Sequence, residues 1–243
     1  GNNGYGKLGN GSYTNKNVPT LVSQGARPSA DVTFISISAG YIHTCGLGSD
    51  GNGYCWGGNT KGQLGNGFNG GGTESTTPAL VSQGARPSAD VTFVSISAGG
   101  YHTCGVGSDG NGYCWGYNYY GQLGNSNSGL GVDSNVPVLV SQGAMGSSVT
   151  FVNISVGQYH TCGLGSDGKG YCWGRNNYGQ LGNSNTTDSN TPVLVNQGAM
   201  GSGVTFSSIS TSSNHTCGLG SDGKGYCWGS NSYGQLGNGY NGS

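Results

Sequence analysis

His43-Thr-Cys45-Gly-Leu-Gly-Ser-Asp-Gly-Asn-Gly-Tyr-Cys55-Trp56-Gly57 is the stretch around which the chain is organised. It returns with small changes at residues 102–116, 160–174 and 215–229, always with its two cysteines ten positions apart. All 8 cysteines, all 4 tryptophans and all 4 histidines of the chain lie within these four copies. A fourfold repeat therefore dominates the sequence.

The paired cysteines of each copy predict disulfide bonds formed in an oxidising compartment. One alternative is zinc held by His43, Cys45 and Cys55, but zinc sites favour cysteines about two to four residues apart, and each copy lacks a fourth ligand. Free thiols are the other alternative. We therefore expect an extracellular or cell-surface protein without a bound metal, with the pairs Cys45–Cys55, Cys104–Cys114, Cys162–Cys172 and Cys217–Cys227.

Composition narrows the classes of partner. Charged residues make up 7% of the 243 residues, the net charge is −1, and the 8 lysines and arginines are scattered, so no basic patch exists to neutralise nucleic-acid phosphates. No apolar run reaches the roughly 20 residues that span a bilayer. The 53 glycines recur in register with Cys, Tyr, Trp, Ile and Leu, which indicates a folded repeat and not a disordered segment. We expect neither a nucleic-acid partner nor a membrane span.

Each period predicts four short strands and no helix. A strand with a proline at residues 18–22 suits a sheet edge, residues 34–39 alternate with period two, and residues 43–48 and 53–57 form a hairpin closed by an Asp-Gly turn. The period, measured at the last leucine of each repeat, is about 55–59 residues (Leu8, Leu64, Leu123, Leu181, Leu236). This spacing favours all-β, β-propeller-type blades of four antiparallel strands over a solenoid, whose coils are shorter. We interpret residues 1–243 as a single repeat array, with an outer strand and loop at 1–33 and blade units at 34–81, 93–140, 151–195 and 206–243.

The hairpin register follows from the cysteines. With Cys45 opposite Cys55, Leu47 shares the cysteine face, while Tyr54 and Trp56 point to the other face. Gly46 then lies opposite Tyr54, which leaves room for an aromatic ring to cover the glycine backbone. A disulfide closing so short a loop stabilises the fold by about 2–3 kcal/mol in the chain-entropy model.

The segment Tyr113-Cys-Trp-Gly-Tyr-Asn-Tyr-Tyr-Gly-Gln-Leu-Gly124, preceded by Ile96-Ser-Ala-Gly-Gly-Tyr-His102, resembles regulator of chromosome condensation repeats. The resemblance covers nearly the whole chain. It implies a β-propeller, most often of seven blades, with the Ile-Ser-Ala-Gly strand innermost and the Pro-x-Leu-Val strand outermost. Family functions diverge: one member is a nuclear exchange factor for a small GTPase, another is a secreted β-lactamase inhibitor, and many are extracellular bacterial repeat proteins. This chain is most similar to the last, cysteine-bearing group.

The strand count predicts an open or polymerised array and not a closed seven-bladed ring. The first outer strand, at 18–22, has no inner strands before it, and the last three strands have no outer strand after them. A four-bladed ring could join them, but the loop at residues 1–12 is repeated near residues 229–240, and a closed ring has no need for it twice. Two explanations fit the duplicated loop: the 243 residues belong to a longer array, or the chain self-associates. For the second we expect association head to tail or by donation of a strand.

Nothing in the sequence predicts catalysis, a metal or a cofactor. The histidines and the turn aspartates recur once per copy, whereas an active site needs different residues to converge. A calcium site needs several carboxylates in one loop, and each turn offers one. We expect no enzyme activity from these residues: His43, His102, His160, His215, Asp50, Asp109, Asp167 and Asp222.

Two sets of surface residues are candidates for binding or modification. Tyrosines in the loops after tryptophan could bind a glycan or protein ligand, or could instead pack against adjacent blades (Tyr117, Tyr119, Tyr120, Tyr178, Tyr233). Asn-x-Ser/Thr sequons are candidate glycosylation sites (Asn10, Asn185, Asn214, Asn241). Asn185 is the best of these. Asn153 is a further sequon, but it lies in an inner strand, where we expect it to be inaccessible.

The sequence thus favours an extracellular, disulfide-stapled repeat protein that acts as a structural, self-assembling or protein-interaction module, such as the building block of a surface filament. The alternative hypothesis is a soluble propeller that binds a protein or glycan through one loop face, as an inhibitor or a lectin does. A hydrolase or lyase is the least favoured hypothesis.

Overall fold

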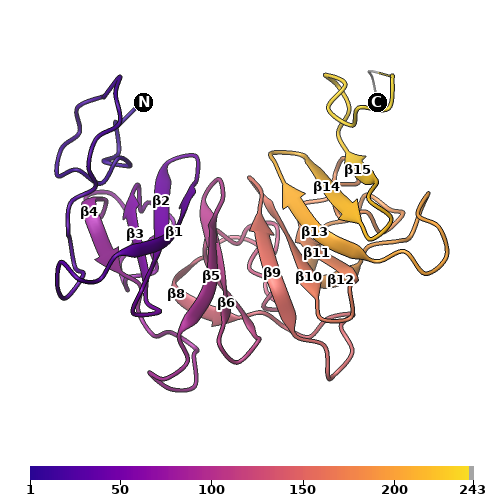
Figure 1. Cartoon of the computed structure of the whole chain (residues 1–243), viewed down its shortest axis with the longest axis horizontal. Coiled ribbons are helices and arrows are strands. Elements are labelled where there is room, and N and C mark those ends of the chain that lie inside the picture. Colours follow the sequence, from indigo (N-terminus) through magenta and orange to yellow (C-terminus); the bar gives the residue numbers. More distant parts are fainter. Residues whose placement is uncertain (241–243) are drawn as a thin grey trace.

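The computed structural model describes residues 1–240, which contain fifteen β-strands and no helix (Figure 1). The inner strands are β1 (Phe34–Ala39), β5 (Phe93–Ala98), β9 (Phe151–Val156) and β13 (Phe206–Thr211). The second strands are β2 (His43–Gly48), β6 (His102–Gly107), β10 (His160–Gly165) and β14 (His215–Gly220). The third strands are β3 (Gly53–Gly57), β7 (Gly112–Gly116), β11 (Gly170–Gly174) and β15 (Gly225–Gly229), and the outer strands are β4 (Ser75–Leu80), β8 (Ser134–Leu139) and β12 (Ser189–Leu194).

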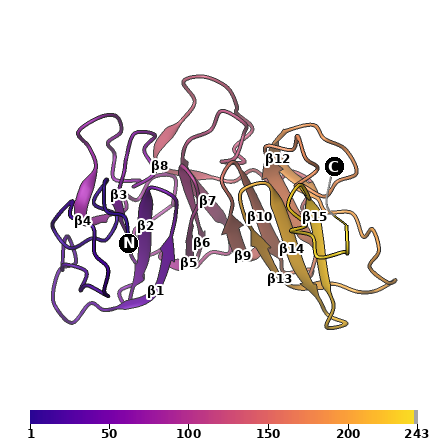
Figure 2. The same ribbon diagram turned by 90° about the horizontal axis from the view of Figure 1, so that it is seen from above.

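These strands form four separate antiparallel sheets, here called blades 1 to 4 in chain order. The sheets fan out side by side in an open arc, with the inner strands along one side and the outer strands along the other (Figures 1 and 2). The predicted all-β blades, their strand order and their open arrangement are confirmed. Within residues 1–240 no helix is long and apolar enough to cross a membrane.

Each hairpin has the register that the cysteines predict. Cys45 pairs with Cys55, Thr44 with Trp56 and Gly46 with Tyr54. The disulfides join the two strands of each hairpin, with Cα–Cα distances of 4.0 to 4.1 Å (Cys45–Cys55, Cys104–Cys114, Cys162–Cys172, Cys217–Cys227). The cysteines are therefore not available as zinc ligands.

A bulge in each inner strand changes two details of the predicted packing. In β5 the register shifts between Phe93 and Ser95, so Phe93 and Ile96 are buried whereas Val94 is 56% exposed. The freed Phe93 ring covers Gly105, where an added Cβ would lie 2.7 Å from the ring. An aromatic ring thus covers this glycine, as expected, and the inner-strand phenylalanine supplies it.

The hydrophobic cores lie between blades. One face of blade 1, its disulfide face (Cys45, Leu47, Cys55, Leu64), packs against one face of blade 2, its aromatic face (Phe93, Ile96, Tyr113, Trp115). The same two faces meet between blades 2 and 3 and between blades 3 and 4. Each of these three clusters thus buries apolar side chains of one blade against its neighbour.

The two ends of the array differ from the inner blades. Residues 18–22, predicted as an outer strand, form no strand, because no third strand lies beside them to pair with. Within residues 1–240, blade 4 has three strands and no outer strand pairs with β15. The predicted strand at 18–22 is therefore wrong for this structure, although the mismatch in strand count is as expected.

Candidate functional site

The buried histidines connect neighbouring blades. His43 Nε2 lies 2.8 Å from Thr103 Oγ1, and that hydroxyl donates to Gln63 O at 2.8 Å. Because the hydroxyl proton of Thr103 lies in the bond to Gln63 O, His43 Nε2 must donate to Thr103 Oγ1. The neutral imidazole then has no proton on Nδ1. Burial lowers the pKa of His43 from 6.5 to about 3. His102 and His160 repeat the arrangement with Thr161 and Thr216, so their imidazoles are neutral structural groups.

The turn aspartates are held within their own hairpins. Asp50 accepts hydrogen bonds from Asn52 N at 3.1 Å and from Tyr54 Oη at 2.7 Å. Burial raises the pKa of Asp50, but the bonds from Asn52 and Tyr54 outweigh it and lower the pKa overall. Burial, together with Asp50, raises the pKa of Tyr54 to about 12. Among the described residues no three His, Cys, Asp or Glu side chains gather as a metal site.

Six tyrosines form a continuous aromatic group, here called the tyrosine cluster (Tyr41, Tyr101, Tyr117, Tyr119, Tyr120, Tyr159). Tyr101 and Tyr159 stack with ring centroids 6.0 Å apart, and Tyr117 and Tyr119 stack at 6.3 Å. Tyr120 contacts Tyr119 at 5.0 Å and Tyr159 at 5.4 Å, both edge to face. The cluster therefore joins loops of blades 1, 2 and 3.

Two cations lie over the cluster. Lys61 Nζ is 4.8 Å from the centre of the Tyr117 ring and 3.5 Å from Asp133 Oδ2. Arg175 Cζ is 5.1 Å from the centre of the Tyr120 ring and 5.7 Å from that of Tyr159. An aromatic ring face attracts a cation electrostatically, so these contacts hold both side chains at the cluster.

The sequence predicted only half of this group. Tyr178 and Tyr233 are 45% and 93% exposed and contact none of its rings, whereas Tyr41, Tyr101 and Tyr159 were not anticipated. The hairpin register held the missing signal. The residue before each histidine bonds to the residue after the Trp-Gly pair, as Tyr117 N does to Tyr101 O at 3.0 Å. Tyrosines at these two positions must therefore meet.

The sequons differ in exposure. Asn185 is exposed, whereas Asn10 and Asn214 are half-buried, and Asn241 lies outside the described residues. Asn153 is exposed, because its inner strand borders the open side of the arc; the expectation that it is inaccessible is wrong. Asn185 remains the most favourable candidate for glycosylation.

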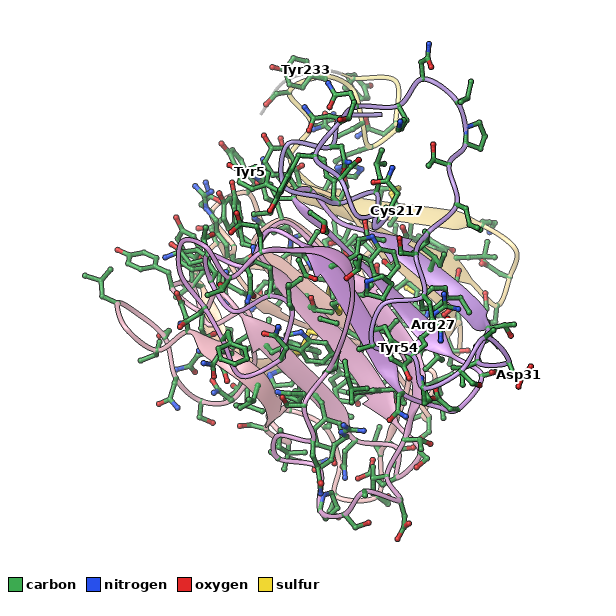
Figure 3. The ribbon with its side chains drawn as sticks, turned by 90° about the vertical axis from the view of Figure 1, so that its left-hand side faces the viewer. Tyr5, Arg27, Asp31, Tyr54, Cys217 and Tyr233 are labelled. Carbon is green, nitrogen blue, oxygen red and sulfur yellow. A yellow bond between two sulfur atoms is a disulfide. The ribbon has the colours of Figure 1, made fainter. Side chains whose placement is uncertain are left out.

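The disulfide face of blade 4 and the aromatic face of blade 1 lack a facing blade. Leu219 is 45% exposed, against 6% for its equivalent Leu164, and Ile37 is 56% exposed, against 8% for Ile96. A hollow of about 480 Å³ beside Ile37 is lined by Val18, Pro19 and Val22, among others. Figure 3 views the molecule from the blade 1 end, where the guanidinium of Arg27 lies over the Phe34 ring. These two faces, here called the open blade faces, have no blade over them. Tyr54 and Trp56 on the blade 1 face are nevertheless buried, and Lys7 and Gly9 of the N-terminal segment contact Trp56.

A loop at the N-terminus covers the rim of blade 1. Between inner blades, Gln63 O accepts hydrogen bonds from Trp115 Nε1 at 3.0 Å and from Thr103 Oγ1 at 2.8 Å. On blade 1, Lys7 O accepts the same bonds from Trp56 at 3.0 Å and from Thr44 at 2.9 Å. Gly9 and Gly65 have φ of +67° and +66°, and a Cβ on either would lie 2.6 Å from an indole nitrogen. Residues 3–9 thus form the same loop as residues 59–65.

Sequence models of the regulator of chromosome condensation (RCC1) repeat match residues 1–47, 50–106, 109–164 and 167–219. The chain belongs to the RCC1 repeat family. This RCC1-repeat chain is 32% identical over 237 residues to the Arabidopsis thaliana ultraviolet-B receptor UVR8, a match that covers 98% of the chain and 49% of UVR8. It is 34% identical over 193 residues to the human probable E3 ubiquitin-protein ligase HERC6, covering 79% of the chain and 17% of HERC6.

Two solved structures share the fold. Human WBSCR16 superposes with a TM-score of 0.76 at 23% identity, covering 98% of this chain and 58% of WBSCR16. Yeast RCC1 (Prp20), solved bound to Kap60, superposes with a TM-score of 0.68 at 26% identity, covering 84% of this chain and 45% of Prp20. The chain spans half or less of the length of UVR8 and HERC6, so the receptor and ligase activities in their names are those of the whole proteins.

Proposed function

We propose that this RCC1-repeat chain is an extracellular, disulfide-stapled structural module that assembles end to end with further copies of itself. The observation that carries the proposal is the pair of open blade faces. Three internal interfaces join a disulfide face to an aromatic face, and blade 4 and blade 1 present one of each. In the assembly, blade 4 of one copy packs on blade 1 of the next.

Strand donation completes blade 4. In blade 1 the third and outer strands pair Tyr54 with Leu80 and Cys55 with Ala79. The equivalent residues of the open edge are Tyr226 and Cys227, and those of the unpaired segment are Leu21 and Thr20. Residues 18–22 of one copy would therefore extend the sheet of blade 4 in its neighbour, by addition of a strand to an exposed edge.

A loop exchange accompanies the contact. Residues 231–237 of one copy take the place of residues 3–9 on blade 1 of the next, since both segments have the same Asn-x4-Leu-Gly pattern. Leu236 N donates a hydrogen bond to Asn231 Oδ1 at 3.0 Å, as Leu8 N does to Asn3 Oδ1 at 2.9 Å. The exchange substitutes one set of backbone bonds for an equivalent set. The gain in free energy comes from burial of the open faces and from the added strand.

The extracellular assignment rests on the disulfides. Four within-hairpin bonds account for all 8 cysteines. Such bonds persist in oxidising compartments and are rare in the cytosol.

Sedimentation velocity of residues 1–243 over a range of concentrations tests the proposal. We expect the sedimentation coefficient to rise with concentration, and electron micrographs of the concentrated protein to show filaments. Leu219→Asp should abolish the rise, because it places a charge on the disulfide face of blade 4. Leu130→Asp is the matched control, since Leu130 is 89% exposed in a distant loop. A monomer at every concentration would contradict the proposal.

A second candidate function, binding of a ligand through one loop face, is favoured by the tyrosine cluster.

A further inference from the structure

We infer that the tyrosine cluster is a docking surface for a protein partner that presents a carboxylate to Arg175. The site is separate from the open blade faces, so it stands or falls independently of end-to-end assembly.

Other blades have the same fold without two of these tyrosines. Tyr117 and Tyr119 correspond to Gly58 and Thr60 in blade 1 and to Ser230 and Ser232 in blade 4. Blade 4 nevertheless builds the same hairpin and the same loop, with Leu236 N bonded to Asn231 Oδ1 as Leu123 N is to Asn118 Oδ1, at 3.0 Å in both. Residues that the fold needs recur in every blade. Tyr117 and Tyr119 have no tyrosine at the equivalent positions of the other blades, so the fold does not explain these two rings.

The rings are held in place before any partner arrives. Each ring of the cluster contacts at least one other, and Tyr117 contacts Tyr101, Tyr119, Tyr120 and Tyr159. Tyr41 and Tyr119 are still 64% and 42% exposed. Ordered tyrosines supply contact area at low entropic cost, and tyrosine and arginine are enriched among the residues that dominate protein interfaces.

Arg175 determines the chemistry of the partner. Its guanidinium lies against Tyr120 and Tyr159 and has no ion pair or side-chain hydrogen bond with any described residue, whereas Lys61 is paired with Asp133. The guanidinium keeps five N–H donors in a planar fork that matches a carboxylate. An acidic side chain is therefore the group that the site lacks.

The surroundings favour a protein over a sugar. A sugar stacks on an open ring face, but Tyr119 and Lys61 lie over Tyr117, and Tyr101 and Arg175 lie over Tyr159. The neighbouring loop is rich in Asn, Ser, Gly and Tyr, the composition of antibody binding loops. A hollow of about 340 Å³ at the inner ends of the blades is lined by Tyr41, Gly99, Gly100 and Gln158, among others, and has room for a protruding side chain.

Selection of a phage-displayed library of random peptides tests the inference. On the wild-type protein we expect enrichment of peptides that carry Asp or Glu. The Tyr101→Asn, Tyr117→Ser, Tyr119→Ser triple variant takes the residues of blade 4, and Arg175→Ser takes its serine. Both should bind the selected peptides at least about tenfold more weakly, as loss of a central interface residue does. Arg175→Glu should instead select basic peptides.

Tyr233→Ser is the matched control, because it removes an exposed loop tyrosine outside the cluster, and it should leave binding unchanged. Thermal unfolding verifies that each variant is folded. If the triple variant does not fold, the two single variants of Arg175 test the inference without it. Equal peptide binding by wild type and Arg175→Ser would overturn the inference. So would binding to acidic oligosaccharides on a glycan array with no enrichment of acidic peptides.

Discussion

Thr103 holds two blades together through one hydroxyl. It donates to Gln63 O and accepts from His43 Nε2, each at 2.8 Å, in a fully buried site. Thr44, the equivalent residue of blade 1, donates to Lys7 O at 2.9 Å but has no histidine of a preceding blade beside it. The same residue type thus has two partners inside the array and one at its end.

Thr103→Val should lower the free energy of unfolding by about 1–3 kcal/mol, because it leaves the buried His43 Nε2–H without an acceptor. Gln63 O loses one of its two hydrogen bonds and keeps the one from Trp115 Nε1. Thr44→Val is the matched control and should cost less. Urea unfolding followed by tryptophan fluorescence measures both. Equal losses for the two variants would show that the bond between His43 and Thr103 adds nothing to stability.

The buried imidazoles predict loss of stability in mild acid. The pKa of His43, His102 and His160 is about 3 in the folded protein and 6.5 in the unfolded chain. Below pH 6.5 the unfolded chain therefore binds more protons than the folded protein does. Their contribution is complete above pH 6.5 and declines as the pH falls from there toward 3. Each group contributes a slope of at most about 1.4 kcal/mol per pH unit.

We therefore expect the free energy of unfolding, measured in urea at intervals between pH 7.5 and pH 4.5, to fall steadily below pH 6.5. His102→Gln should make the slope shallower. A free energy that stays level down to pH 5 would mean that the unfolded chain takes up no extra protons there, contrary to the buried and neutral state of these histidines.

At the scale of the element, the hairpin was predictable and the inner strand was not. The two cysteines are ten residues apart with an Asp-Gly turn between them, so pairing Cys45 with Cys55 fixes the register of the hairpin. That register is observed. The inner strand has a bulge beside Phe93, so period-two alternation does not describe its burial: Ile96 is buried and Val94, two residues earlier, is exposed. The predicted hairpin register was enough to bring Tyr101 beside Tyr117. The contacts of Tyr101 with Tyr41 and Tyr159 join different blades, so they depend on blade packing, which no single hairpin determines.

Removal of a disulfide should have different effects in different blades. In the double variant Cys104→Ala, Cys114→Ala, the free energy of unfolding falls by about 2–3 kcal/mol because the loop is no longer closed. It falls further because sulfur contacts in a fully buried interface are lost. The pair Cys217→Ala, Cys227→Ala loses the same loop closure on an open face and should cost less. Urea unfolding of the two variants measures the difference. A larger loss for the blade 4 pair would contradict burial between blades as the second source of stability.

At the scale of the whole molecule, stability resides in contacts between neighbouring blades. Each disulfide face needs an aromatic face, so the first and last blades are the least complete parts of the array. The strand count in the sequence anticipated this imbalance. It could not reveal that residues 3–9 already occupy the rim of blade 1, because that depends on the backbone carbonyl of Lys7 and not on the identity of its side chain.

Hydrogen–deuterium exchange of residues 1–243 at low and at high protein concentration tests end-to-end assembly most directly. At low concentration the amides of residues 18–22 and the outer edge of β15 should exchange rapidly, because neither has a strand partner. At high concentration both segments should become protected together, and Leu219→Asp should prevent this. Exchange in the two segments that does not change with concentration would contradict the donation of a strand between copies.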